Sequence, residues 1–149
     1  MQRSTKEKRA SLDRLGGDMY NNGSRLFVLR RLDAESSETN TTPDLKIITV
    51  EHVLPQNPDT GSKWLKWYPD DEDRMTWVHR LGNLALLSRR KNAQAQNFEF
   101  DRKKTLYFNS PLTPFALTIQ IIKQTSWTKD VLEKRQKEAL ATLKSLWRL

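Results

Sequence analysis

The sequence predicts an α+β fold, in which a small antiparallel pair of strands is embedded among helices. Two apolar runs, residues 45–53 and 84–88, are rich in β-branched or aliphatic residues and are bounded by Pro or Gly, as strands are. Apolar residues at helical spacing fill much of the remaining chain, most clearly over residues 128–147. With 149 residues, the chain is long enough for one domain with a single core.

The first 40 residues predict two helices that pack on the core. Residues 1–20 have the character of a polar helix that ends near Gly16 and Gly17, and residues 22–37 have amphipathic spacing. Residues 36–43 consist mainly of Ser, Thr, Asn and Glu, and this composition predicts a linker.

This linker divides the chain into an N-terminal helical segment, residues 1–40, and the main part of the domain, residues 41–149. Between the two predicted strands, residues 63–68 form a short aromatic segment. Residues 70–78 predict a helix, because acids at its start suit a helix N-terminus.

Beyond the second strand, the pattern predicts one helix over residues 89–108, which a break near Asn97 could divide. Residues 115–123 suit a strand or a helix equally. The last helix covers residues 128–147, and we expect Thr128 to cap it. Its apolar face comprises Leu132, Ala139, Leu140, Leu143 and Trp147.

The chain is basic, with a net charge of +8, and the charge is uneven. Residues 86–122 hold six basic and two acidic residues, and residues 123–149 hold seven and three. Such a charge indicates an anionic partner or serves solubility. The absence of cysteine excludes disulfides and cysteine-type zinc sites. No apolar run reaches the ~20 residues of a membrane span, and residues 1–20 contain no secretory signal, so we expect a cytoplasmic protein with no membrane partner.

An acid and a histidine, Glu51 and His52, end the first predicted strand, and Pro55 follows closely. An imidazole with an ordinary pKa of about 6.5 can act as a base at neutral pH. Neighbours in a strand point to opposite faces, so these two side chains converge only at a strand end or a bulge. The plainer interpretation is an exposed Glu51 beside a structural His52.

Two asparagines follow the acid–histidine pair in sequence order. Asn83 comes directly after Gly82, and one interpretation is that it is simply a turn residue, since Asn suits turns. The alternative is that its amide oxygen accepts a hydrogen bond from the His52 ring and fixes the tautomer of His52. Asn92 starts a predicted helix, where it caps the helix or joins Glu51 and water as an oxygen ligand of Mg²⁺.

Together the segments "ITVEHVLPQ", "LGNLALLS" and "KNAQAQNFEFDRKK" resemble the C-terminal HNH-type (ββα-metal) nuclease domain of GmrSD-like and Ssp-type restriction and phage-defence proteins, over about residues 26–147. This resemblance implies that His52 is the general base, that Asn83 orients it, and that Glu51 and Asn92 hold the metal. Many HNH enzymes have a histidine in the place of Asn92, so the amide favours Mg²⁺ or Mn²⁺ over zinc.

The same resemblance implies a metal-dependent DNA endonuclease or nickase, the effector part of a DNA-modification-dependent restriction or anti-phage system. An NTPase or modification-sensing domain is then expected N-terminal to it in a longer protein. The residues expected to bind DNA are Arg89, Arg90, Lys91, Asn97, Lys103 and Lys104, although the basic ones also suit a solvated helix face.

Three further side chains have alternative interpretations. His79, the only other histidine, suits packing or the surface, with a phosphate contact as the alternative. Trp64 and Trp67 suit the core, with stacking on a base as the alternative. For the whole chain, the alternatives to a nuclease are a non-catalytic nucleic-acid-binding module and a protein-interaction module.

Overall fold

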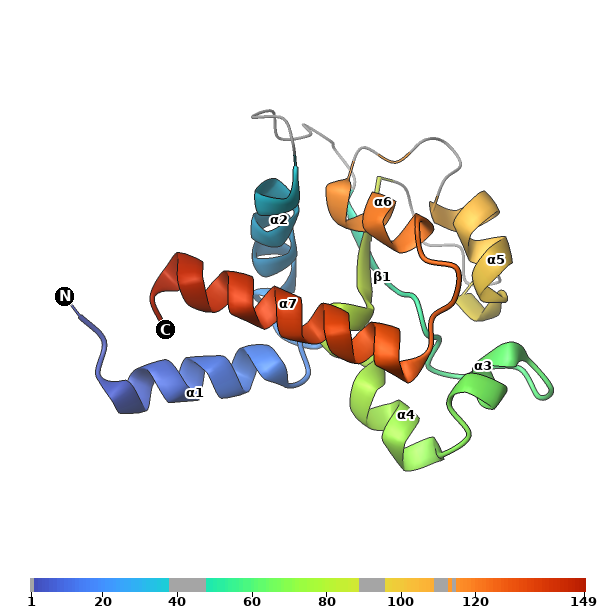
Figure 1. Ribbon diagram of the computed structural model, residues 1–149, viewed down its shortest axis with the longest axis horizontal. Coiled ribbons are helices and arrows are strands. Elements are labelled where there is room, and N and C mark those ends of the chain that lie inside the picture. The colour runs from blue at the N-terminus through green and yellow to red at the C-terminus, as the bar shows by residue number, and fades with distance from the viewer. Residues whose placement is uncertain (1, 38–47, 89–95, 109–112, 114) are drawn as a thin grey trace.

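The computed structural model describes residues 2–37, 48–88, 96–108, 113 and 115–149. Within these residues, helices surround a two-stranded sheet (Figure 1). The elements in chain order are α1 (Thr5–Gly16), α2 (Arg25–Ser36), β1 (Thr49–His52), α3 (Lys63–Trp67), α4 (Asp71–Val78), the 3-10 turn η1 (Leu81–Asn83), β2 (Leu84–Leu87), α5 (Phe100–Arg102), the π-helical η3 (Lys103–Phe108), α6 (Ala116–Ile122) and α7 (Lys129–Trp147).

The two strands pair antiparallel, with Thr49 opposite Leu87 and His52 opposite Leu84. The connection between them is long, because residues 53–83 contain α3, α4 and η1. β2 is buried along its whole length, and α6 packs on it. The mostly helical α+β architecture and the strand pair confirm those parts of the predicted fold. The helix expected to cross the strand pair starts within residues 89–95, which lie outside the described part of the chain.

The first two helices share an apolar cluster with the strand pair, and both contact α7. Ser4 and Glu7 form a capping box at the start of α1, in which each side chain accepts from the other residue's backbone N–H. An apolar cluster joins Leu15 of α1 and Leu29 of α2 to both strands and to Leu143 of α7. A second cluster, around Trp64, Tyr68, Phe100 and Trp127, fills the other end of the molecule.

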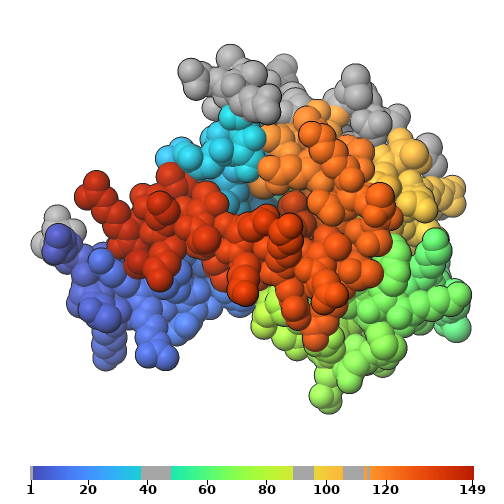
Figure 2. Space-filling model, in the orientation of Figure 1, coloured from blue at the N-terminus to red at the C-terminus, as the bar shows by residue number. Residues whose placement is uncertain are grey.

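Helix α7 runs across one face of the molecule, and its outer side is exposed there (Figures 1 and 2). It packs against η1 at Gly82, where a Cβ atom would lie 2.9 Å from the Gln136 backbone nitrogen and 3.0 Å from the Leu132 carbonyl oxygen. The Gly82 N–H donates to the Gln136 side chain at 2.7 Å. Glycine at this position therefore lets the turn before β2 touch the backbone of α7.

We expect Gly82→Ala to destabilise the fold by about 1–3 kcal/mol, because neither the turn nor the helix backbone can yield cheaply. The measurement is the free energy of unfolding in urea. Gly23→Ala is the matched control, since a Cβ there meets nothing within 4 Å. Equal stabilities of the two variants would contradict the close packing of η1 on α7.

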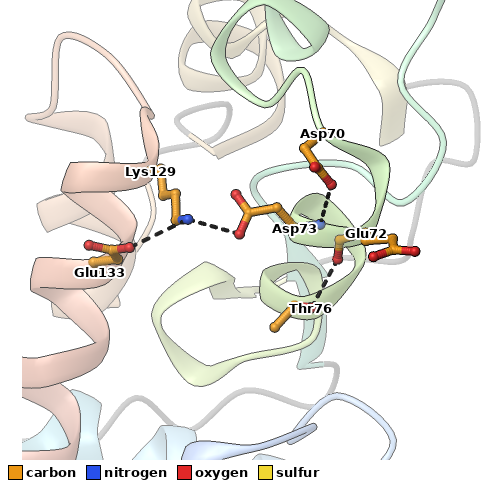
Figure 3. A network of polar contacts seen from close by, with 6 residues as sticks. All are labelled: Asp70, Glu72, Asp73, Thr76, Lys129 and Glu133. Atoms are coloured by element: carbon orange, nitrogen blue, oxygen red, sulfur yellow. Dashed lines mark hydrogen bonds and ion pairs between the residues drawn. The ribbon is translucent and has the colours of Figure 1, made fainter.

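A small ion-pair network joins the start of α7 to the start of α4 (Figure 3). The Lys129 ammonium lies 2.8 Å from the Asp73 carboxylate and 3.8 Å from that of Glu133. Asp70 caps α4 by accepting from the Asp73 N–H at 2.9 Å. Half-exposed ion pairs contribute at most about 1 kcal/mol, so this network orients the two helices more than it stabilises them.

Within the part of residues 89–108 that the structure describes, the predicted helix is divided near Asn97, which the sequence allowed. Residues 96–99 are not α-helical, and α5 begins only at Phe100. The Phe98 carbonyl accepts from the Trp64 indole N–H at 2.9 Å, and the Glu99 carboxylate accepts from the Lys63 N–H at 3.1 Å. These tertiary contacts hold the segment on α3.

Residues 115–123, which suited either strand or helix, form α6. Thr128 occupies the cap position of α7 as expected, although its side chain makes no capping hydrogen bond. Among the described residues, no helix is both long and apolar enough to cross a membrane.

Candidate active site

Glu51 and His52 lie at the end of β1 and line the same small cavity, of about 160 Å³. Glu51 is 2% exposed and His52 is 8% exposed. The chain bends directly after His52, which lets these consecutive side chains meet at one cavity. Larger hollows, such as that of about 210 Å³ between α2, α6 and α7, contain no histidine. The other residues around the acid–histidine cavity are Tyr20, Pro55, Gln56, Asn57, Gln96 and Asn97.

Lys103 lies buried behind this pair. Its ammonium group donates to the carbonyl oxygens of His52 at 2.9 Å and Val53 at 2.7 Å. Burial lowers the pKa of Lys103 to about 7, while the negative charge of Glu51 acts in the opposite direction. A side chain that is 0% exposed cannot reach a DNA phosphate, so the assignment of Lys103 to DNA binding is wrong. Lys103 instead holds the end of β1 in place.

We expect Lys103→Met to flatten the pH dependence of stability of the metal-free protein. The folded-state pKa of about 7 is below the ordinary value of 10.5, so between these values the unfolded chain binds a proton that the folded protein does not. The free energy of unfolding therefore rises with pH in this window, by up to about 1.4 kcal/mol per pH unit. Below it, both states are protonated and the full cost of burying the ammonium remains.

The measurement is urea unfolding in EDTA at several pH values within this window. Lys129→Met is the control, because Lys129 is half-exposed and its pKa is raised, by its hydrogen bond to Asp73 first of all. In the Lys129→Met variant, the free energy of unfolding should still rise with pH as it does in the wild type. A wild-type slope in Lys103→Met would show that Lys103 does not titrate in this range.

Asn83 is fully buried, and its amide is used by backbone and tryptophan groups. Its Oδ1 accepts from the Leu54 N–H at 2.8 Å and the Trp127 indole N–H at 3.0 Å. Its Nδ2 donates to the carbonyl oxygens of Leu54 at 3.0 Å and Val78 at 2.8 Å. The expected hydrogen bond from the His52 ring to the Asn83 amide oxygen is therefore not formed. Asn83 instead fixes the loop that follows β1, and acts on His52 only through the backbone.

One partner of the His52 ring is His79, which the sequence interpretation placed in packing or at the surface. His52 Nε2 lies 2.9 Å from His79 Nδ1. The Tyr20 ring contacts both imidazoles, with centroid distances of 4.0 Å to His52 and 5.4 Å to His79. The sequence alone contained no signal for this contact, because His79 comes near His52 only when Leu84, at the start of β2, pairs with His52.

The remaining predicted DNA contacts divide into three groups. Arg89, Arg90 and Lys91 lie outside the described residues, as does Asn92, the expected second metal ligand. Asn97 lines the cavity. Lys104 is largely covered, because its ammonium donates to the Gln124 carbonyl at 2.9 Å and lies 3.5 Å from the Asp101 carboxylate.

The chemistry of the cavity residues fits a hard cation. In the described part of the chain, no three His, Cys, Asp or Glu side chains gather as a metal cluster. The cavity offers the carboxylate of Glu51 and the amides of Gln56, Asn57, Gln96 and Asn97. Such oxygen donors suit Mg²⁺ or Mn²⁺, which take one or two protein ligands and keep several waters. Zinc would need more nitrogen or sulfur ligands than the described residues supply.

A family model described as "GmrSD restriction endonucleases, C-terminal domain" matches residues 4–142. Neither the curated proteins nor the solved structures contain a significant match to the chain.

Proposed function

Because the chain belongs to the family of C-terminal domains of GmrSD restriction endonucleases, we propose that it is the HNH-type, metal-dependent DNA-cutting domain of such an enzyme. The observation that carries this proposal is the acid–histidine pair, Glu51 and His52, on one polar cavity at the end of β1. An acid and an imidazole at one small site are the groups that phosphodiester hydrolysis needs from a protein.

In the proposed reaction, His52 is the general base. Its imidazole accepts a proton from a water molecule as the water oxygen bonds to phosphorus and the bond to the leaving sugar oxygen breaks. Glu51 and Asn92 are the proposed protein ligands of one Mg²⁺ or Mn²⁺, which would neutralise charge on the phosphate and the leaving oxygen. The loop between β1 and α3 supplies Gln56 and Asn57 at the cavity.

Asn83 and Lys103 support this site from behind. Asn83 binds both backbone polar groups of Leu54, and Lys103 binds the carbonyls of His52 and Val53. Consecutive backbone groups from His52 to Leu54 are thus anchored by buried side chains. The imidazole is held on a rigid strand end, as positioning for a single proton transfer requires.

The proposal includes the setting of the domain. Residues 1–40 and 41–149 form one unit, which is supported by the apolar cluster that Leu15 and Leu29 share with the strands and α7. Its substrate is DNA in the cytoplasm. A modification-sensing NTPase domain of the same enzyme would direct the cutting, as part of restriction or phage defence.

The test of this proposal is cleavage of supercoiled plasmid DNA by the purified chain with Mg²⁺, with Mn²⁺ and with EDTA. We expect conversion to nicked or linear DNA with either cation and none with EDTA. Cleavage that persists in EDTA would exclude the metal mechanism. Salt-dependent DNA binding without cleavage in any cation would favour a non-catalytic nucleic-acid-binding module.

We expect the three basic residues 89–91 to bind phosphates, since they directly precede Asn92. Replacing all three by Ala should weaken binding to every DNA sequence alike. It should also lower the slope of log affinity against log salt by up to about 0.9 per lost phosphate contact. The measurement is fluorescence anisotropy of a labelled duplex at several salt concentrations.

The matched control replaces three exposed basic residues at the N-terminal end, Arg3, Lys6 and Arg9. It removes the same charge and should leave the salt slope nearly unchanged. Equal losses in both triple variants would mean that net charge, and not a local contact, attracts the DNA.

A further inference from the structure

His79 is placed to control the imidazole of His52, and neither the resemblance nor the family match assigns it a role. The two rings meet through His52 Nε2 and His79 Nδ1, 2.9 Å apart, which is hydrogen-bond distance. His79 is not among the residues that line the cavity, whereas His52 is. The second histidine therefore lies behind the first, as seen from the place where substrate would bind.

The position of His79 is fixed by its own surroundings. It ends α4, and its carbonyl oxygen accepts from the N–H groups of Met19 at 2.9 Å and Tyr20 at 3.1 Å. The Tyr20 ring stacks on the His79 ring with 11° between the planes. The segment between α1 and α2 thus holds the His79 backbone and covers its ring.

A neutral imidazole has one N–H donor and one acceptor nitrogen. If His52 Nε2 carries the proton and donates it to His79 Nδ1, then His52 Nδ1 is the basic nitrogen. Gln56, a cavity residue, has its amide nitrogen 3.5 Å from His52 Nδ1, so an N–H donor faces that atom. The His79 contact at Nε2 and the Gln56 contact at Nδ1 are compatible with the same tautomer.

We propose that His79 is the positioning residue of the catalytic imidazole: it accepts the His52 Nε2–H and thereby keeps Nδ1 unprotonated and directed to the cavity. This inference rests on the proposed role of His52 as general base. It assigns to His79 the orienting role that the resemblance implied for Asn83. A base locked in one tautomer begins every turnover with its acceptor nitrogen ready.

The alternative occupant of the space between the rings is a metal ion. Two zinc–nitrogen bonds of about 2.0–2.1 Å at a tetrahedral angle hold their nitrogens about 3.4 Å apart. The 2.9 Å separation is shorter than that. No third His, Cys, Asp or Glu in the described part of the chain completes such a cluster. The geometry favours a shared proton.

Two variants of the full chain test the role. His79→Phe keeps an aromatic ring against Tyr20 but has no acceptor, and His79→Asn replaces the ring by an amide whose oxygen can take the place of Nδ1. We expect His79→Phe to lower kcat about 10–100-fold with KM and the unfolding midpoint nearly unchanged. His79→Asn should recover most of the loss, which a merely structural ring would not allow.

The second readout is the tautomer of His52 from long-range ¹H–¹⁵N NMR at a pH of about 8, where an ordinary imidazole is neutral. The chain has two histidines, so the His79→Phe spectrum contains His52 alone. We expect the Nε2–H form in the wild type and a mixture in His79→Phe. An Nδ1–H form of His52 in the wild type would overturn the inference.

The outcomes separate this inference from the proposed function. A wild type that never cuts DNA refutes the nuclease, while the NMR spectrum still decides whether His79 sets the tautomer. Wild-type kcat in both His79 variants overturns the inference and leaves the nuclease standing. The inference would also be overturned, in favour of a metal site, if one equivalent of Zn²⁺ shifted the NMR signals of both imidazoles and EDTA reversed the shift.

Discussion

His52→Ala should lower the rate of plasmid cleavage about 10²–10⁴-fold while DNA binding and the unfolding midpoint stay near those of the wild type. The imidazole is 8% exposed, and its Nε2 faces the His79 ring at 2.9 Å. Its loss removes a proton acceptor in the transition state, not a contact with the DNA backbone. The measurement is the single-turnover rate of nicking at saturating protein, with binding followed by anisotropy.

Variants of the proposed metal ligands provide the comparison. Glu51→Ala and Asn92→Ala should also fail to cut in Mg²⁺, but because the cation is held too weakly. Raising the Mn²⁺ concentration should partly restore both of them and leave His52→Ala inactive. Restoration of His52→Ala and not of Asn92→Ala would mean that the two roles are reversed. Full activity of all three would make the motif structural only.

Asn83→Ala should destabilise the fold severely, by at least about 3 kcal/mol, and lose activity for that reason. Four buried groups lose their partner: the N–H and carbonyl of Leu54, the Val78 carbonyl and the Trp127 indole N–H. Each buried polar group left unsatisfied costs about 1–3 kcal/mol, against a total stability of about 5–15 kcal/mol for a domain. The measurement is urea unfolding of the purified variant.

Asn21→Ala is the matched control, because Asn21 is exposed and its amide bonds only within its own turn, to Asp18 at 2.7 Å. It should cost less than about 1 kcal/mol. A variant Asn83→Ala that keeps the wild-type urea midpoint of unfolding but cuts DNA slowly would contradict the structural role of Asn83. It would mean that Asn83 orients His52 directly, as the resemblance implied. An insoluble Asn83→Ala beside a soluble Asn21→Ala agrees with the structural role.

The strand pair and the acid–histidine pair could be predicted because their signals are local. A β-branched run from Ile47 to Val50, stopped soon after by Pro55, predicts a strand end whatever the rest of the chain does. The apolar run after Gly82 predicts the second strand in the same way. Convergence of Glu51 and His52 on one cavity then follows from the end of the strand.

The partners of the buried polar groups could not be predicted, since they come from distant segments. The Lys103 ammonium meets carbonyls about 50 positions earlier in the chain, and the Asn83 amide meets Trp127, 44 positions later. A Lys-Lys pair after an acidic residue looks like a solvated surface until the fold places one lysine inside. Likewise His79 shows its relation to His52 only once β1 and β2 are paired.

The helix expected over residues 89–108 is divided near Asn97 for a related reason. Its periodicity is helical, but Trp64 and Lys63 of α3 bind the backbone of Phe98 and the side chain of Glu99 and hold the chain in an irregular form. Tertiary contacts of this kind override local propensity. The same contacts bring Gln96 and Asn97 to the cavity.

The most direct test of the central claim is an anomalous diffraction map of the protein crystallised with Mn²⁺ and a short DNA duplex, with His52→Ala used to prevent cutting. We predict one Mn²⁺ peak in the cavity, about 2.0–2.2 Å from oxygens of Glu51 and Asn92 and bonded to a phosphate of the DNA. We expect no Mn²⁺ peak between Lys103 and the end of β1, because the Lys103 ammonium already binds the carbonyl oxygens of His52 and Val53 there. A cavity free of Mn²⁺, or a cation bound elsewhere with the scissile phosphate, would contradict the account.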